Sequence, residues 1–173
     1  MLHAQGADAL AVELLSKAVA LEEVTQDEIE QIPADRQRVV QTISRLSRSS
    51  SFRRQVTAAY EHRCAVTRMQ LRLVDAAHIL PVGVEGSNDE VANGICLSPT
   101  YHRAYDSGLI YLDESLTMRI NEKKENELIH VGLAGGLHDF KAFLDQRIHL
   151  PQNKQQRPSI EFIRAANRFR GIE

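Results

Sequence analysis

The apolar residues in the first fifty positions recur at the spacing of helices. Residues 7–22, rich in alanine and leucine, predict an amphipathic helix. Thr-Gln-Asp-Glu at 25–28 predicts a capping box that opens a second, short helix, which Pro33 interrupts. A third helical run over 35–47 leads into a serine-rich stretch at 47–51, which we take as a boundary. We expect the helices before it to serve packing.

Beyond the serine-rich stretch, the pattern changes repeatedly between helical and strand-like spacing. In chain order it predicts a helix over 51–63, strands over 71–81 and 94–97, a short helix over 99–106, a hairpin over 109–120 that turns near Asp113, and closing helices over 137–148 and 159–169. This order predicts a small α+β protein that follows an N-terminal helical segment.

Composition and charge narrow the class of protein. The 173 residues, 43% of them apolar, suffice for one core, and no apolar run approaches the roughly 20 residues of a membrane helix. We find no secretion-signal pattern, and two cysteines with seven histidines suit a cytoplasmic setting. The net charge of −2 hides an arginine-rich segment over 45–72. Arginine forks suit phosphate, but a solvated basic face is an equal alternative.

The short helix after the second strand carries the first sign of chemistry. Ser98 and Pro99 predict its start, with the serine hydroxyl as cap, and Gly108 predicts its stop. His102 and Asp106 lie four residues apart and therefore point the same way. Such a pair is either a surface hydrogen bond or two ligands of one metal ion, and the helix alone does not decide between them.

Three sequence blocks carry a family resemblance. They are DAAHILP at 75–81, NGICL at 93–97 and HRAYDSGL at 102–109, and they contain His78, Asn93 and His102. In their order they resemble the HNH endonucleases, also called His-Me finger or ββα-metal nucleases, in a bacterial branch with similar blocks. The likeness covers most of 52–171. It implies a ββα-metal core with a flanking hairpin and helices. The expected domains are a helical segment, 1–48, and an HNH endonuclease domain, 49–173.

The resemblance also implies roles for these residues. Phosphodiester hydrolysis needs a deprotonated water and positive charge near the phosphoryl oxygens. By analogy His78 is the general base, Asn93 braces the loop that orients His78, and His102 binds a divalent metal. Asp106 is the expected second metal ligand. The expected metal is Mg²⁺ or Mn²⁺, with Zn²⁺ or Ni²⁺ as alternatives.

The chain departs from the family pattern at two places. Many members carry a metal ligand immediately before the general base, where this chain has Ala77. Asp75 is the nearest carboxylate, and in an ideal strand it faces away from His78, so a ligand role and a structural role stay equally open. Cys64 and Cys96 lack the partners of a closed zinc site, so we expect no structural zinc and interpret both as buried apolar residues.

The favoured interpretation is a metal-dependent DNA endonuclease, a restriction or defence enzyme, with double-stranded DNA as substrate. Arg53, Arg54 and Arg103 are the expected phosphate contacts. A homodimer and a separate specificity domain are expected partners, and a membrane is not. The main alternative is a catalytically silent finger that binds nucleic acid or protein, which the missing ligand at Ala77 favours. A nonspecific, toxin-like nuclease is a third hypothesis.

Overall fold

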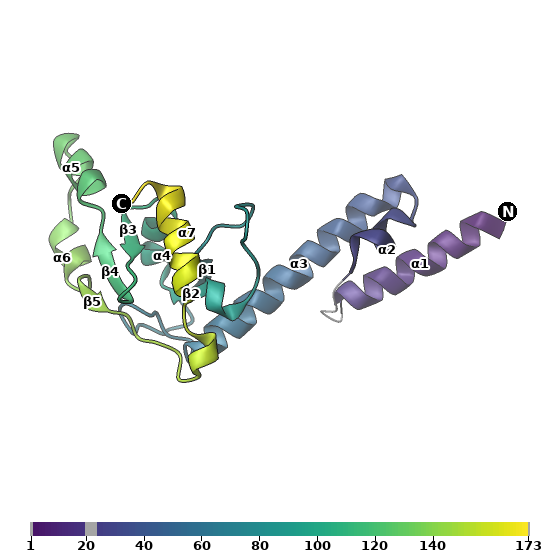
Figure 1. The fold of residues 1–173 in the computed structure, drawn as a ribbon, viewed down its shortest axis with the longest axis horizontal. Helices are drawn as coiled ribbons and strands as arrows, with labels where there is room; N and C mark the ends of the chain where they lie inside the picture. Colours follow the sequence, from purple (N-terminus) through teal and green to yellow (C-terminus); the bar gives the residue numbers. More distant parts are fainter. Residues whose placement is uncertain (1, 20–23, 173) are drawn as a thin grey trace. The chain divides into compact units, whose positions relative to one another are not determined.

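The protein consists of two compact units in a computed structural model that describes residues 2–19 and 24–172. Residues 1–52 form the first unit and residues 53–173 the second. Figure 1 shows the elements in chain order, and the division falls within the helix α3 (Ala34–Ala59). The last three residues of the helix predicted over 7–22 lie outside the described residues.

The first unit is helical, and its apolar stripes meet in a small core. Helix α1 (Leu2–Val19) and helix α2 (Gln26–Glu30) precede α3. Buried residues from the three helices and from the turn between α2 and α3 form the core: Ala11, Leu14, Ile29, Ile32 and Val40. The predicted capping box is confirmed, because the Thr25 side chain accepts from the Glu28 N–H while Glu28 accepts from the Thr25 N–H at 2.9 Å. Lys17 Nζ lies 2.8 Å from Glu28 Oε1 and so joins α1 to α2.

Helix α3 passes through the serine-rich stretch without a break. The prediction that a helix ends near residue 47 and that another begins near 51 is therefore wrong. Serine in a helix interior costs only about 0.5 kcal/mol relative to alanine, so a short serine run does not interrupt a helix that its flanks support. On the second half of α3, the predicted stripe is confirmed, since Phe52, Val56 and the following Tyr60 are all buried.

Two short strands and one helix lie at the centre of the second unit. Strand β1 (Asp75–His78) pairs antiparallel with β2 (Gly94–Leu97), with His78 opposite Gly94 and Asp75 opposite Leu97. The 3₁₀ turn η1 (Val91–Asn93) leads into β2. Helix α4 (Pro99–Asp106) follows and packs against both strands. The predicted order of strand, loop, strand and helix is confirmed, although β1 is shorter than the predicted strand over 71–81.

The ends of α4 follow from its local sequence, with one correction. Ser98 is the N-cap and Pro99 the first helical residue, but the Ser98 hydroxyl makes no capping hydrogen bond. The Ser98 carbonyl accepts from the His102 N–H at 2.8 Å, so the backbone and the fixed φ of Pro99 start the helix. Gly108 has a φ of +70°, the left-handed conformation predicted for the stop.

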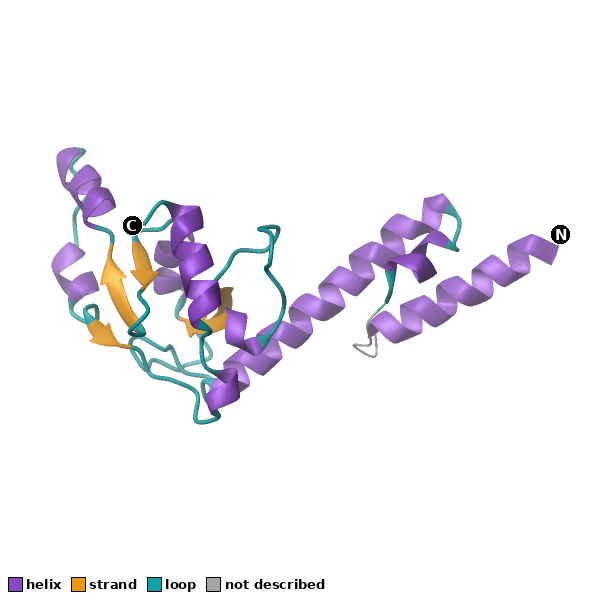
Figure 2. Cartoon of the chain, in the orientation of Figure 1, coloured by secondary structure: helices purple, strands orange, loops and turns teal. Residues whose placement is uncertain are grey.

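A second, three-stranded sheet supports α4. The predicted hairpin is confirmed as β3 (Ile110–Leu112) and β4 (Thr117–Ile120), and β5 (Gln146–Arg147) pairs with β4. Figure 2 shows these strands in orange. Helices α5 (Glu122–His130), α6 (Leu137–Lys141) and α7 (Ile160–Arg170) complete the unit with a 3₁₀ turn (Lys154–Gln156). Ile79, Ile95, Leu112 and Ile163 are among the fully buried core side chains.

The prediction of one helix over 137–148 is wrong. Helix α6 ends at Lys141, and Asp145 adopts a φ of +57° while its N–H donates to the Met118 carbonyl at 2.8 Å. Sheet pairing therefore overrides the local helical pattern. Helix α5, which has no buried residue, was not predicted because it lacks an apolar stripe. No helix among the described residues is long and apolar enough to span a membrane.

Candidate functional site

His78 ends strand β1, and its ring meets an aspartate from the loop that follows. His78 Nε2 lies 2.9 Å from Asp89 Oδ1, and the two side chains are 18% and 42% exposed. The loop brings Asp89 back to the strand end although eleven residues separate the pair. Sequence reasoning missed Asp89, because its polar loop carries no pattern that marks one carboxylate.

Asn93 is fully buried and closes the loop between β1 and β2. Its Oδ1 accepts from the Leu80 N–H at 2.8 Å, and its Nδ2 donates to the Asn88 carbonyl at 2.8 Å. Further contacts of Nδ2 go to the Leu80 carbonyl at 3.2 Å and the Ser87 hydroxyl at 3.3 Å. One side chain thus connects the residues just after His78 to the segment that carries Asp89.

His102 lies between two carboxylates on the exposed side of α4. Its Nε2 is 3.3 Å from Asp106 Oδ2, and its Nδ1 is 3.7 Å from Asp75 Oδ2. Asp75 also faces Arg53, whose Nη2 lies 3.2 Å from Asp75 Oδ1. Three elements therefore contribute to a chain of charges, from the end of α3 through β1 to α4.

The two carboxylates are at opposite ring nitrogens, which limits how a metal ion can bind. With the ring in this orientation, one ion can be shared by His102 and Asp106 or by His102 and Asp75, but not by all three. Throughout residues 2–19 and 24–172, no three or more His, Cys, Asp or Glu side chains are grouped as metal ligands. Mg²⁺ commonly takes only one or two protein ligands and completes its shell with water and substrate phosphates. The residues fit such an ion and not a closed protein cage.

The predicted phosphate-contact residues differ in their surroundings. Arg54 and Arg103 are exposed, and neither pairs with a carboxylate in the described parts of the chain. Arg53 is 64% exposed and forms an ion pair with Asp75. Arg53 also borders a cavity of about 640 Å³ together with His62 and Arg72. Arg54 and Arg103 are consequently better available to a phosphate than Arg53.

Arg170 connects the elements that carry His78 and His102. Its Nη1 donates to the carbonyl of Ile79 at 3.1 Å, directly after His78, and its guanidinium lies 4.4 Å from the ring centroid of the buried Tyr105. Helix α7 thereby holds the end of β1 against α4. Arg170 lies within the C-terminal part of the sequence resemblance, but sequence reasoning gave it no role.

The prediction that both cysteines are buried residues is confirmed. Cys64 and Cys96 are free and fully buried. Burial raises the pKa of the Cys96 thiol to about 12, with the neighbouring Cys64 contributing. Because metals bind the thiolate, this environment disfavours Cys96 as a ligand.

Residues 64–113 match the family HNH_2, described as HNH endonuclease, and this segment contains His78, Asn93 and His102. This match supports the prediction of a nuclease, and HNH nucleases generally use a divalent metal ion. Among solved structures, the chain is similar to a protein titled "Modification dependent TagI restriction endonuclease", at 19% identity and a TM-score of 0.45. The likeness covers 69% of this chain and only 37% of that one. No curated protein matches the chain.

Proposed function

We propose that this protein is a metal-dependent DNA endonuclease whose ββα-metal core consists of β1, β2 and α4. One observation carries the proposal: in the segment that matches the HNH family, Asn93 closes the loop after His78, while His102 lies between two carboxylates on the packed helix α4. Double-stranded DNA is the proposed substrate, and restriction or defence is the proposed role.

In this proposal His78 is the general base that takes a proton from the attacking water. A neutral imidazole serves this purpose near neutral pH. Asp89, 2.9 Å from Nε2, orients the ring and favours the tautomer that carries its hydrogen on Nε2. The proton from water then goes to the other ring nitrogen. Asn93 acts on this step indirectly, because it holds the backbone on both sides of the His78–Asp89 pair.

The metal ligands in this proposal are His102, through Nε2, and Asp106. Their 3.3 Å separation and their i, i+4 spacing on α4 support this pair. Asp75 then orients the His102 ring from the Nδ1 side, and Arg53 holds Asp75 in turn. When bound, a divalent ion supplies positive charge for the phosphoryl and leaving oxygens. The protein contributes the ligand spacing and the ring orientation.

Exposed arginines hold the nucleic-acid backbone in this proposal. Arg54 and Arg103 are available for phosphate contacts, which position a duplex without selecting its sequence. Base-specific recognition has no side-chain signature in this segment, so the proposal assigns it to a separate domain or subunit.

A plasmid-nicking assay with the full chain tests the proposal. Wild-type protein is expected to convert supercoiled plasmid to the open form with Mg²⁺ or Mn²⁺ and to stop when a chelator is added. His78→Ala is expected to lower the rate by about 100-fold or more, because a general base contributes on that scale. His130→Ala, a change at an exposed histidine on α5, is the matched control and should cleave like wild type.

Equal cleavage by wild type and His78→Ala would contradict the assignment of the base. A wild-type protein that binds DNA but never cleaves it with any divalent ion would instead favour the silent-finger alternative. The buried Ala77, which offers no ligand at the position that many relatives use, is the observation behind that alternative.

A further inference from the structure

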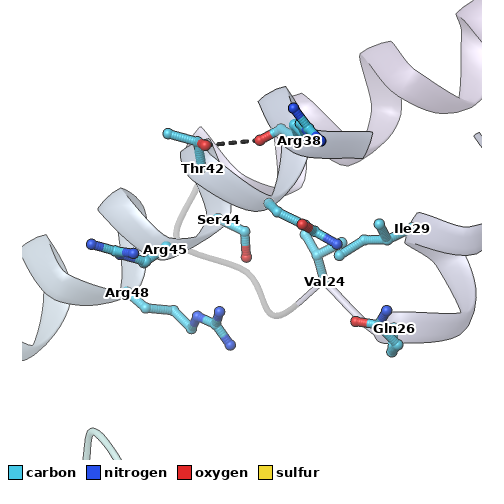
Figure 3. A pocket seen from close by; sticks show the side chains of 9 residues that line it. Val24, Gln26, Ile29, Arg38, Thr42, Ser44, Arg45 and Arg48 are labelled. Carbon is cyan, nitrogen blue, oxygen red and sulfur yellow. Dashed lines mark hydrogen bonds between the residues drawn. The ribbon is translucent and has the colours of Figure 1, made fainter. Parts of the chain in front are cut away.

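The first unit contains a polar pocket that the nuclease mechanism does not use. A cavity of about 660 Å³ lies between α2 and α3 (Figure 3). Val24, Gln26 and Ile29 line it on the α2 side. The α3 side carries Arg38, Arg45 and Arg48 together with Gln41, Thr42 and Ser44. All of these residues belong to residues 1–52, so the pocket is a feature of that unit alone.

Among the residues that the structure describes, the three arginines of the pocket have no carboxylate partners. Arg38, Arg45 and Arg48 are exposed, and none pairs with an acidic side chain in the described sequence. By contrast, Lys17 in the same unit pairs with Glu28 at 2.8 Å. At a helical rise of 1.5 Å per residue, the backbone positions of Arg38 and Arg48 lie about 15 Å apart along α3. The charges therefore form a row, not a single point.

Ser44 supplies a second, independent sign of a ligand. Ser44 is only 3% exposed, and its hydroxyl makes no hydrogen bond within the described part of the chain. By contrast, the Thr42 hydroxyl on the same helix donates to the Arg38 carbonyl at 2.8 Å. Figure 3 shows the Ser44 oxygen directed into the pocket. The Ser44 hydroxyl is therefore free to donate to an acceptor atom that enters the pocket.

We propose that the α2–α3 pocket binds the phosphodiester backbone of a nucleic acid. The guanidinium fork matches phosphate oxygens, and the Ser44 hydroxyl provides a neutral donor at the same place. A row of charges about 15 Å long fits successive phosphates of one strand and exceeds what a single small anion can contact. The first unit is thus a binding module for the polyanion and not only a packing segment.

The salt dependence of DNA binding tests this proposal without any cleavage. Full-length protein in a chelating buffer is titrated into a fluorescein-labelled duplex at several salt concentrations, and anisotropy gives the Kd. Replacing Arg38, Arg45 and Arg48 by Gln is expected to reduce the slope of log K against log salt by about 3, one unit for each lost phosphate contact. The control replaces Arg147, Lys154 and Arg168 by Gln. These are exposed basic residues of the second unit, and the slope should change much less.

Two further measurements identify the ligand. Ser44→Ala is expected to raise the Kd without changing the salt slope, because a hydroxyl carries no charge. A deoxynucleoside monophosphate, added as competitor, should not displace the duplex if the pocket reads a backbone. Displacement that depends on the three arginines would overturn the backbone assignment in favour of a free nucleotide.

If the triple arginine variant kept the salt slope and the Kd of wild type, the assignment of the α2–α3 pocket as a nucleic-acid site would be wrong. Arginine-to-glutamine changes at exposed helix positions leave the core intact, and far-UV circular dichroism checks that the helices persist. This outcome differs from a failure of the catalytic proposal, which would appear as equal nicking by wild type and His78→Ala with DNA binding unaltered.

Discussion

Two polar clusters in the second unit differ in burial and in charge. Around Asn93, an uncharged amide is fully buried, and its hydrogen-bonding groups contact neighbouring backbone and the Ser87 hydroxyl. Around His102, charged groups lie at the surface, and Asp106 remains 61% exposed. The His102 ring has carboxylates on both sides but no close, buried partner.

This difference indicates that the Asn93 cluster maintains a backbone conformation, whereas the His102 cluster is suited to binding a ligand. A satisfied hydrogen bond in a low-dielectric interior specifies a backbone conformation, and losing it leaves buried groups without partners. An exposed ion pair contributes little to stability, because water and salt screen it. It can exchange partners with an incoming cation or phosphate. We therefore expect changes at Asn93 to lower the free energy of unfolding, and changes at His102 to reduce metal binding and cleavage.

The largest effect should come from His102→Ala. Loss of this ligand removes several kcal/mol of charge stabilisation, so we expect plasmid cleavage to fall by about 100-fold or more. Isothermal titration with Mn²⁺ should show a parallel loss of affinity, while the unfolding midpoint stays near that of wild type. His138→Ala, at another exposed histidine, is the matched control.

Two aspartate variants sharpen this result. Asp106→Asn should weaken Mn²⁺ binding more than Asp75→Asn does, because Asp106 lies at the ring nitrogen that we assign to the metal. The opposite order would move the metal to the Nδ1 side of His102.

Asn93→Ala tests the buried side of the comparison. The change leaves the Leu80 N–H and the Asn88 carbonyl without partners, so we expect the free energy of unfolding to fall by about 3 kcal/mol. Urea denaturation measures it, and Asn126→Ala on the exposed face of α5 should stay near wild type. A stable Asn93→Ala protein that merely cleaves slowly would show that the amide serves catalysis and not the loop.

Asp89→Asn tests the orientation of His78 and should have a moderate effect. The amide keeps the shape but loses the charge, so we expect the cleavage rate to fall by about tenfold, as for carboxylates that orient a histidine. The Kd for DNA should be unchanged under chelating conditions. A weaker Kd at an unchanged maximal rate would assign Asp89 to substrate binding instead.

Arg53→Gln should have the smallest effect. The Arg53–Asp75 pair is exposed, and we expect the free energy of unfolding to change by less than about 0.5 kcal/mol in thermal or urea denaturation. If this variant lost as much stability as Asn93→Ala, the contrast between the two clusters would not hold.

Local signals in the sequence predicted several elements well. The Thr25–Glu28 capping box, the left-handed Gly108 and the hairpin near Asp113 depend on a few adjacent residues, and each formed as predicted. The elements predicted wrongly depend on competition with distant partners. The serine-rich stretch continues a helix, and Gln146–Arg147 pairs with β4 instead of extending α6.

By itself, the sequence determined the chemical inventory and its order: two histidines, an asparagine and a carboxylate one helical turn after the second histidine. The two histidines and the asparagine were predicted from the three sequence blocks and the family that these blocks resemble, and only the pairing of His102 with Asp106 came from helix spacing. Tertiary structure alone decided that Asp89 meets His78, that Asp75 and Asp106 meet opposite nitrogens of His102, and that Arg170 joins their elements. The reason is physical: such contacts arise when strands pair and helices pack, and no local pattern encodes which distant side chains then become neighbours.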